Sequence, residues 1–175
     1  MHFNMKPICL LRPLIGAAFS WVMTMTAAFA SPQLDCELQI AKAQTIGQPV
    51  TLSFTLRNTG ARAAWVLAWN TPLEGLRGRF LRVTGPKGEL AYLGPQFKRA
   101  QPDGAQYHRV AAGQSLSASV DLGLAYALDT PGRYRLNFTG NLLDVVQAPA
   151  QPPRAMDDFQ PQQLRCPSLS WEMKP

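Results

Sequence analysis

Few residues in this sequence have types and spacings that could support catalysis. The 175-residue chain contains two histidines, His2 and His108. A Ser-His-Asp triad would need His108, because His2 belongs to an N-terminal segment with the features of a signal peptide. Asp157-Asp158 is an acidic pair in a Pro/Gln-rich region, whereas acid–base catalysis needs carboxyl groups held rigidly in a pocket. We therefore expect no catalytic residues, and His108 is interpreted as a structural or surface residue.

The first 30 residues have the three parts of a secretory signal peptide. Lys6 and Arg12 give a basic start, LIGAAFSWVMTMTAAFA is apolar, and Ala28-Phe29-Ala30 matches a cleavage site. A transmembrane anchor is the alternative, but the segment is short and is interrupted by Ser and Thr. Cleavage would leave residues 31–175, enough for one domain, in the periplasm or outside the cell and free of the membrane.

The cysteines agree with export. Cys9 would leave with the signal peptide, and Cys36 and Cys166 would remain as an even pair in an oxidising compartment. We predict that they form a disulfide, which the chain-entropy model values at about 4–5 kcal/mol for a loop this long. A redox or metal pair is the alternative. With no C-x-x-C and one remaining histidine, we expect neither a metal site nor a cofactor.

Charge argues against nucleic acid as a partner. The chain has 17 Lys and Arg against 11 Asp and Glu, and loss of Lys6 and Arg12 would lower the net charge from +6 to +4. The basic residues are scattered, whereas nucleic-acid binding needs a concentrated basic patch or a known module.

Apolar and polar residues alternate with period two along most of the mature chain. This pattern predicts short β-strands. The clearest examples are residues 34–40, 50–57, 116–122 and 134–138, and residues 63–69 are apolar enough for a strand covered on both faces. We therefore predict an all-β fold over residues 31–146, an immunoglobulin-like β-sandwich of seven or eight strands, with an open barrel as the competitor. Residues 147–175 are interpreted as a Pro/Gln-rich tail tied back by Cys166.

Several short pieces occur in an order that is typical of one family. They are NTG at 58–60, Trp69, TPLEG at 71–75, Phe80, YLGP at 92–95, Lys98-Arg99, Tyr107, AAGQSLSASVDL at 111–122, AYAL at 125–128 and PGRY at 131–134. The order resembles the accessory β-sandwich domain that precedes the catalytic domain in deuterolysin-type and peptidyl-Lys metalloendopeptidases. The chain departs from that family because it has no zinc-binding H-E-x-x-H. The resemblance therefore implies the accessory sandwich without the peptidase.

Two loops are the best candidates for a binding surface, because end loops of sandwiches often carry function. Residues 70–79 and 94–106 combine apolar and arginine side chains, as protein interfaces do. The candidate contact residues are Leu73, Glu74, Leu76, Arg77, Arg79, Phe97, Lys98 and Arg99. The alternative is that Leu73 and Leu76 fold back onto the core. Trp65 and Trp69 are expected in the core, and Trp171 either caps the sandwich or is exposed.

The leading functional hypothesis is a non-catalytic protein-binding module. The resemblance implies a metallopeptidase as one partner, for which the chain would act as inhibitor or chaperone. The alternatives are a structural, adhesion or carbohydrate-binding envelope domain and, third, an unrecognised enzyme.

Overall fold

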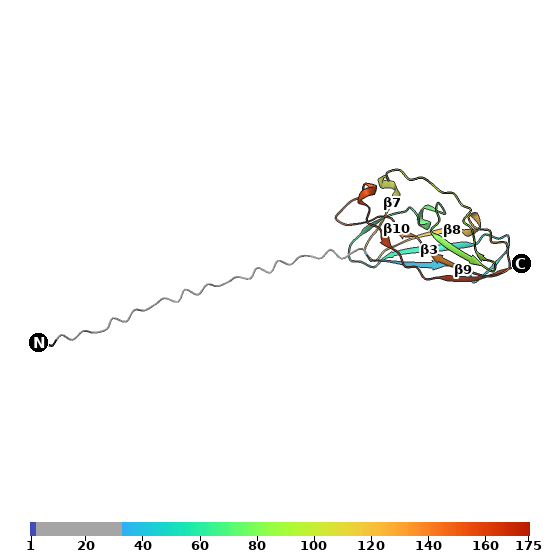
Figure 1. Ribbon diagram of the computed structural model, residues 1–175, viewed down its shortest axis with the longest axis horizontal. Coiled ribbons are helices and arrows are strands. Elements are labelled where there is room, and N and C mark those ends of the chain that lie inside the picture. The colour runs from blue at the N-terminus through green and yellow to red at the C-terminus, as the bar shows by residue number, and fades with distance from the viewer. Residues whose placement is uncertain (3–32) are drawn as a thin grey trace. The chain divides into compact units, whose positions relative to one another are not determined.

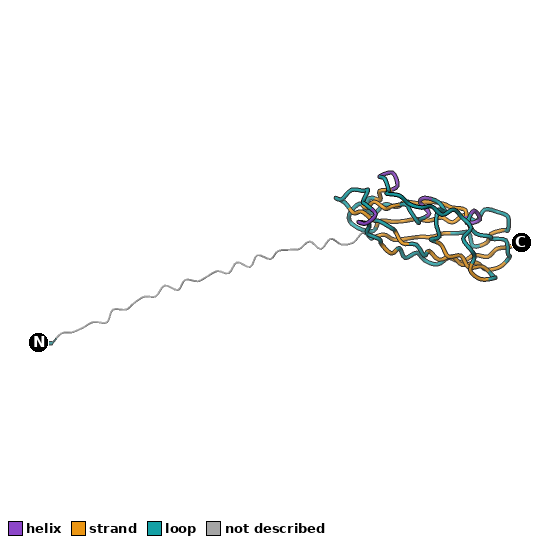
Figure 2. Tube along the Cα trace, turned by 45° about the horizontal axis from the view of Figure 1, so that its top comes forward, coloured by secondary structure: helices purple, strands orange, loops and turns teal. Residues whose placement is uncertain are grey.

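Most of this protein consists of strands in which buried and exposed residues alternate. The computed structural model describes residues 1–2 and 33–175, so the predicted signal peptide lies almost wholly outside the described residues. The contacts divide the chain into two units, Met1–Ala30 and Ser31–Pro175. In β3 (Thr51–Asn58), Leu52, Phe54 and Leu56 are fully buried while the residues between them face outward. Strands and loops make up almost all of residues 33–175, with only short 3-10 turns, as Figure 2 shows.

The strands form four sheets, which are mostly antiparallel. β3 and β8 run side by side in the first sheet (Figure 1), which has the order β1 (Leu34–Gln39), β3, β8 (Ser115–Asp121). The largest sheet has the order β2 (Ala43–Thr45), β13 (Leu169–Lys174), β9 (Gly132–Phe138), β5 (Leu81–Gly85), β6 (Gly88–Glu89). A third has the order β11 (Val145–Gln147), β4 (Ala64–Leu67), β7 (Tyr107–Val110), and β10 (Asn141–Leu142) pairs with β12 (Gln162–Gln163).

The all-β sandwich prediction is confirmed. Thirteen strands lie in the described residues, and eight of them have at least four residues. The remaining five are pairings of two or three residues, which the period-two pattern cannot show. The 3-10 turns are η1 (Pro72–Glu74), η2 (Gly104–Gln106), η3 (Leu122–Leu124) and η4 (Met156–Asp158).

Two apolar clusters stabilise the fold. The main core joins buried residues of the first and largest sheets, such as Phe54 of β3 and Tyr134 of β9. β4 contributes Val66 to this core and Leu67 to a smaller cluster with Trp69, Tyr107 and Val146. β4 is therefore covered on both faces, as its apolar sequence predicts.

The last part of the expected tail is a strand inside the largest sheet. β13 pairs with β2 on one side and with β9 on the other. Trp171 lies opposite Tyr134, and the two rings stack with centroids 5.3 Å apart. Trp171 is 2% exposed, so it belongs to the core. The Pro/Gln-rich composition ends before β13, where Leu169, Trp171 and Met173 alternate with polar residues as in the other strands.

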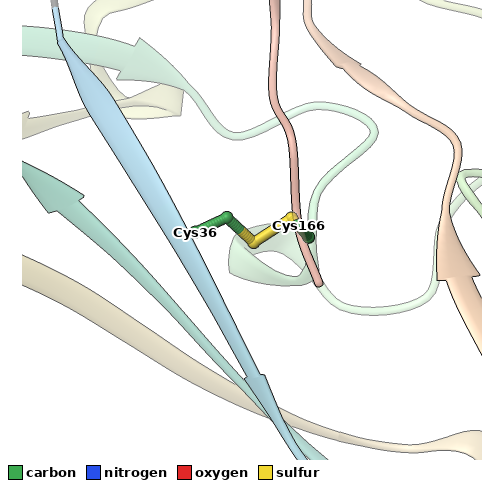
Figure 3. The surroundings of a disulfide bond; sticks show 2 residues. All are labelled: Cys36 and Cys166. Atoms are coloured by element: carbon green, nitrogen blue, oxygen red, sulfur yellow. A yellow bond between two sulfur atoms is a disulfide. The ribbon is translucent and has the colours of Figure 1, made fainter. Parts of the chain in front are cut away.

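The predicted disulfide is present. Figure 3 shows Cys36 on β1 bonded to Cys166 on the segment that leads to β13. The two Cα atoms are 4.9 Å apart although 130 positions separate them in the sequence. The bond holds the approach to β13 against the first sheet.

Candidate functional site

A rigid turn follows β4 and presents the first of the two candidate loops. The Thr71 side chain is buried, and its hydroxyl donates to the Ala68 carbonyl and accepts from the Leu73 amide. Thr71 thereby caps η1, which begins at Pro72, where proline is favourable. Gly75 closes the turn at φ 83°, a left-handed conformation that glycine adopts without strain. The turn is therefore held by hydrogen bonds between the Thr71 hydroxyl and the backbone on either side of it.

Glu74 joins the two candidate loops. Its Oε1 accepts hydrogen bonds from the Asn70 amide at 2.8 Å and from Nη2 of Arg99 at 2.6 Å. The Glu74 side chain is 10% exposed and that of Arg99 is 21% exposed. A charge-assisted bond shielded from solvent to this extent is stronger than a surface ion pair. It fixes Arg99, from the second loop, against the first.

Arginine and aromatic side chains stack beside this ion pair. The Arg99 guanidinium lies 4.9 Å from the ring centre of Trp69 and 5.7 Å from that of Phe97. Arg77 approaches the Phe97 ring at 5.3 Å. These distances fall within the range of cation–π attraction. We call Trp69, Glu74, Arg77, Phe97 and Arg99 the Arg–aromatic surface.

Tyr92 anchors the second loop close to its start. Its hydroxyl lies within hydrogen-bonding distance of the Leu76 carbonyl, at 2.8 Å, and of the Pro95 carbonyl, at 3.0 Å. Burial raises the pKa of Tyr92, and the nearby Glu74 carboxylate raises it further. The neutral phenol is the form that can donate to these carbonyls, so the Tyr92 hydroxyl links the two candidate loops.

The structure brings together four of the eight candidate residues. Glu74, Arg77, Phe97 and Arg99 belong to the Arg–aromatic surface. Leu73 and Leu76 are half-buried against the main core, so the alternative that they fold back is the one the structure shows. Arg79 pairs with Glu89 of β6 at 2.9 Å, and Lys98 is exposed. Whether these residues contact a partner stays a prediction.

The buried carboxylate of Asp144 was not predicted. Tyr107 donates its hydroxyl to Oδ2 at 2.8 Å, while Arg154 and the Gln160 amide donate to Oδ1 at 3.3 and 2.9 Å. Burial raises the pKa of Tyr107 to about 12, helped by its bond to Asp144. These bonds fasten residues 154–160 to the body, where the Phe159 and Trp69 rings form a T-shaped pair with centroids 6.4 Å apart. The signal in the sequence was a lone acid within the apolar run LLDVV.

The residues considered for catalysis lie on different elements. His108 lies on β7 and pairs with Val66 in the β4–β7 ladder. Asp157 and Asp158 lie exposed in η4. Within residues 1–2 and 33–175, no group of three or more His, Cys, Asp and Glu side chains could hold a metal ion. The same residues contain no helix that is long and apolar enough to cross a membrane.

Comparison with known proteins gives one relative and several distant structures. No family model matches the chain. The chain is 28% identical over 120 residues to an extracellular protease of Aeromonas hydrophila. The match covers 66% of this chain but 34% of the protease, so the chain spans about a third of its relative.

The solved structures are more distant. The CARDB domain of the PF1109 protein from Pyrococcus furiosus, in complex with di-metal ions, has a TM-score of 0.37 at 9% identity. That comparison covers 83% of this chain and 96% of the domain. A β-glucosidase from Listeria innocua in complex with gluconolactone has a TM-score of 0.34 at 11% identity. That comparison covers 82% of this chain and 16% of the β-glucosidase. No functional statement about this chain follows from either structure.

The similarity and the disulfide agree on location. The relative is an extracellular protein, and disulfides persist in oxidising compartments outside the cytoplasm. Both observations indicate an exported protein.

Proposed function

We propose that this chain is an exported, non-catalytic β-sandwich that binds another protein through the Arg–aromatic surface. The observation that carries the proposal is the setting of Phe97. Its side chain is an exposed large hydrophobic residue, 50% exposed, flanked by the guanidinium groups of Arg77 and Arg99. Aromatic and arginine residues dominate the binding energy of protein interfaces.

Preorganisation of this surface supports the proposal. Glu74 fixes Arg99, and Tyr92 fixes the loop that bears Phe97. Binding therefore orders few additional side chains, which lowers the entropic cost of association. An isolated surface phenylalanine without such support would be a weaker candidate.

We further propose a secreted metallopeptidase as the partner, in the periplasm or outside the cell. The likeness to part of an extracellular protease supports a secreted peptidase, and the resemblance to the accessory domain of metalloendopeptidases is the reason for choosing the metallo- class. A domain that resembles one portion of a protease would contact a peptidase in the way that this portion contacts the rest of the protease. The bound chain would then act as an inhibitor or as a folding chaperone.

The test is a binding and inhibition assay with metallopeptidases secreted by the source organism. Phe97→Ala should weaken binding by about tenfold or more, as loss of an interface anchor does. Met156→Ala is the matched control, because Met156 is an exposed apolar residue, 41% exposed, on η4. Arg77→Ala should also weaken binding, and Arg135→Ala, at an exposed arginine on β9, is its control.

If the purified protein neither slows nor copurifies with any such peptidase, the protease link is wrong. If a partner binds equally well to the Phe97→Ala and Met156→Ala proteins, the assignment of the surface is wrong. The carbohydrate-binding alternative is tested on a glycan array. Trp171 cannot provide an exposed ring for sugar stacking, because it is stacked inside the core.

A further inference from the structure

A pocket of about 460 Å³ lies between the turn that follows β2 and the segment that follows β8. Ile46 and Pro49 contribute from the turn, and Leu124 and Leu128 contribute from the segment. Sites for small ligands and side chains usually measure about 300–1,000 Å³. We call this cavity the end pocket. None of its lining residues belongs to the Arg–aromatic surface.

Hydrogen bonds hold both walls of the end pocket in place. Oδ1 of Asp121 accepts from the amides of Val50 and Gly123, at 3.0 and 2.9 Å. The Leu122 amide donates to the Val50 carbonyl at 2.9 Å, and the Ile46 amide donates to the Lys174 carbonyl at 3.0 Å. The pocket is therefore built by the fold and does not depend on a ligand for its shape.

The floor of the end pocket is apolar, and so is its rim. Val50 and Tyr126 are buried beneath it, at 1% and 3% exposure. At the rim, Leu124 is 77% exposed, the highest value of any large hydrophobic residue in 33–175. Leu93, which is also exposed, donates its amide to the Ala125 carbonyl next to Leu124. Exposed apolar residues gathered around a cavity mark a contact site more often than scattered ones do.

The charges of the end pocket have one sign. Asp121 and Asp129 line it, and no Lys or Arg is among its described lining residues. This contrasts with the net charge of the whole chain, which is +6. A carboxylate beside an apolar surface favours a cationic side chain that also has an apolar stem, as Lys and Arg have.

We propose that the end pocket docks a peptide segment of a partner protein in which a Lys or Arg is flanked by apolar residues. The apolar neighbours would cover Leu124 and Leu128, and the cation would meet Asp129 at the mouth. The Lys or Arg that meets Asp129 would belong to the partner protein. This inference does not depend on the proposed function of the Arg–aromatic surface, because the two surfaces share no residue.

The test uses the full exported protein and two labelled peptides, Ala-Leu-Lys-Leu-Ala and Ala-Leu-Glu-Leu-Ala, both capped at their ends. The lysine peptide should bind saturably, and the amide signals of Gly47, Gly123 and Leu128 should shift during an NMR titration. Leu124→Ser should weaken this binding by about tenfold, the order expected when a leucine contact is lost. Asp129→Asn should weaken it severalfold and reduce its sensitivity to salt.

Two exposed residues outside the pocket supply matched controls. Met156→Ser and Asp157→Asn remove an apolar and an acidic side chain from η4 and should leave binding unchanged. All four substituted residues are exposed or lie at a rim, so the variants should fold.

Three results would overturn the proposal. The first is no saturable binding of the lysine peptide, and the second is equal binding of the lysine and glutamate peptides. The third is a concentration-dependent dimer that Leu124→Ser abolishes, which would make a second copy of this chain the occupant. Loss of peptide binding in the control variants would contradict the location of the site.

Discussion

Nη1 of Arg154 lies 3.3 Å from Oδ1 of Asp144, whose side chain is completely buried. Asp144 also accepts from Tyr107 of β7 and from the Gln160 amide, so one carboxylate binds three donors from two segments, β7 and residues 154–160. Breaking a buried, hydrogen-bonded pair by removing one partner is strongly destabilising, because the other group is left unsatisfied. The segment around Arg154 is therefore part of the folded body.

Asp144→Asn should lower the free energy of unfolding by about 2–4 kcal/mol. Urea denaturation measures the change. Asp157→Asn is the control and should stay within about 0.5 kcal/mol of the unsubstituted protein, because Asp157 is exposed. Equal stability of the two variants would mean that Asp144 is not a structural anchor.

Stability should fall at high pH because two phenols are held neutral in the fold. Burial raises the pKa of both Tyr107 and Tyr126 from 10.0 to about 12. Between these values the unfolded chain releases protons that the folded chain keeps, so stability is lost as pH rises from about 10 to about 12. Urea midpoints across this range and phenolate absorbance measure the effect.

Tyr107→Phe tests the contribution of one phenol. The substitution removes one of the groups whose pKa the fold raises, so the high-pH loss of stability should become smaller. If phenolate absorbance showed that all tyrosines ionise near pH 10, the environments given for Tyr107 and Tyr126 would be incorrect.

Trp171→Ala should destabilise the sandwich by about 3–5 kcal/mol, because it opens a cavity beside Tyr134. Trp171→Phe should cost clearly less. It keeps an aromatic ring and removes the indole N–H, a buried group without a hydrogen-bond partner among the described residues. Thermal unfolding of both variants gives the comparison. A harmless Trp171→Ala would contradict the place of β13 within the sheet.

Much of the fold could be predicted from local sequence, but the site could not. Period-two alternation predicts β1, β3, β8 and β9, because burial on one face of a strand is encoded residue by residue. The disulfide could be predicted because Cys36 and Cys166 are the two cysteines that remain once the expected signal peptide is removed. The same alternation runs through Leu169–Lys174, but the Pro/Gln-rich composition before it led us to interpret the whole segment as a tail.

Contacts between loops have no comparable local signal. Glu74 and Arg99 are 25 positions apart in segments without a repeating pattern, and their ion pair depends on how both loops pack on the core. The composition of residues 70–79 and 94–106 predicted a binding surface, which stays a prediction. The inward packing of Leu73 and Leu76 was one of the two alternatives that the sequence left open, whereas the contacts of Phe97 with Arg77 and Arg99 had no signal in the sequence.

Glu74→Gln should loosen the second candidate loop. Arg99 would lose its charged partner, so trypsin should cleave after Lys98 and Arg99 about tenfold faster, since a charge-assisted bond shielded from water resists opening. Glu89→Gln is the control, because it frees Arg79 at an exposed pair and leaves Arg99 untouched. Equal cleavage of both variants would show that Glu74 does not fix the loop.

The interior position of β13 sets the order of events during biogenesis. The chain leaves the ribosome, and crosses any export channel, with its N-terminus first. Until residues 169–174 emerge, β9 lacks one neighbour and β2 has no strand to join. Early portions of the chain can pair β1 with β3, but the largest sheet must wait for its last strand. The largest sheet thus stays incomplete until Lys174 has emerged.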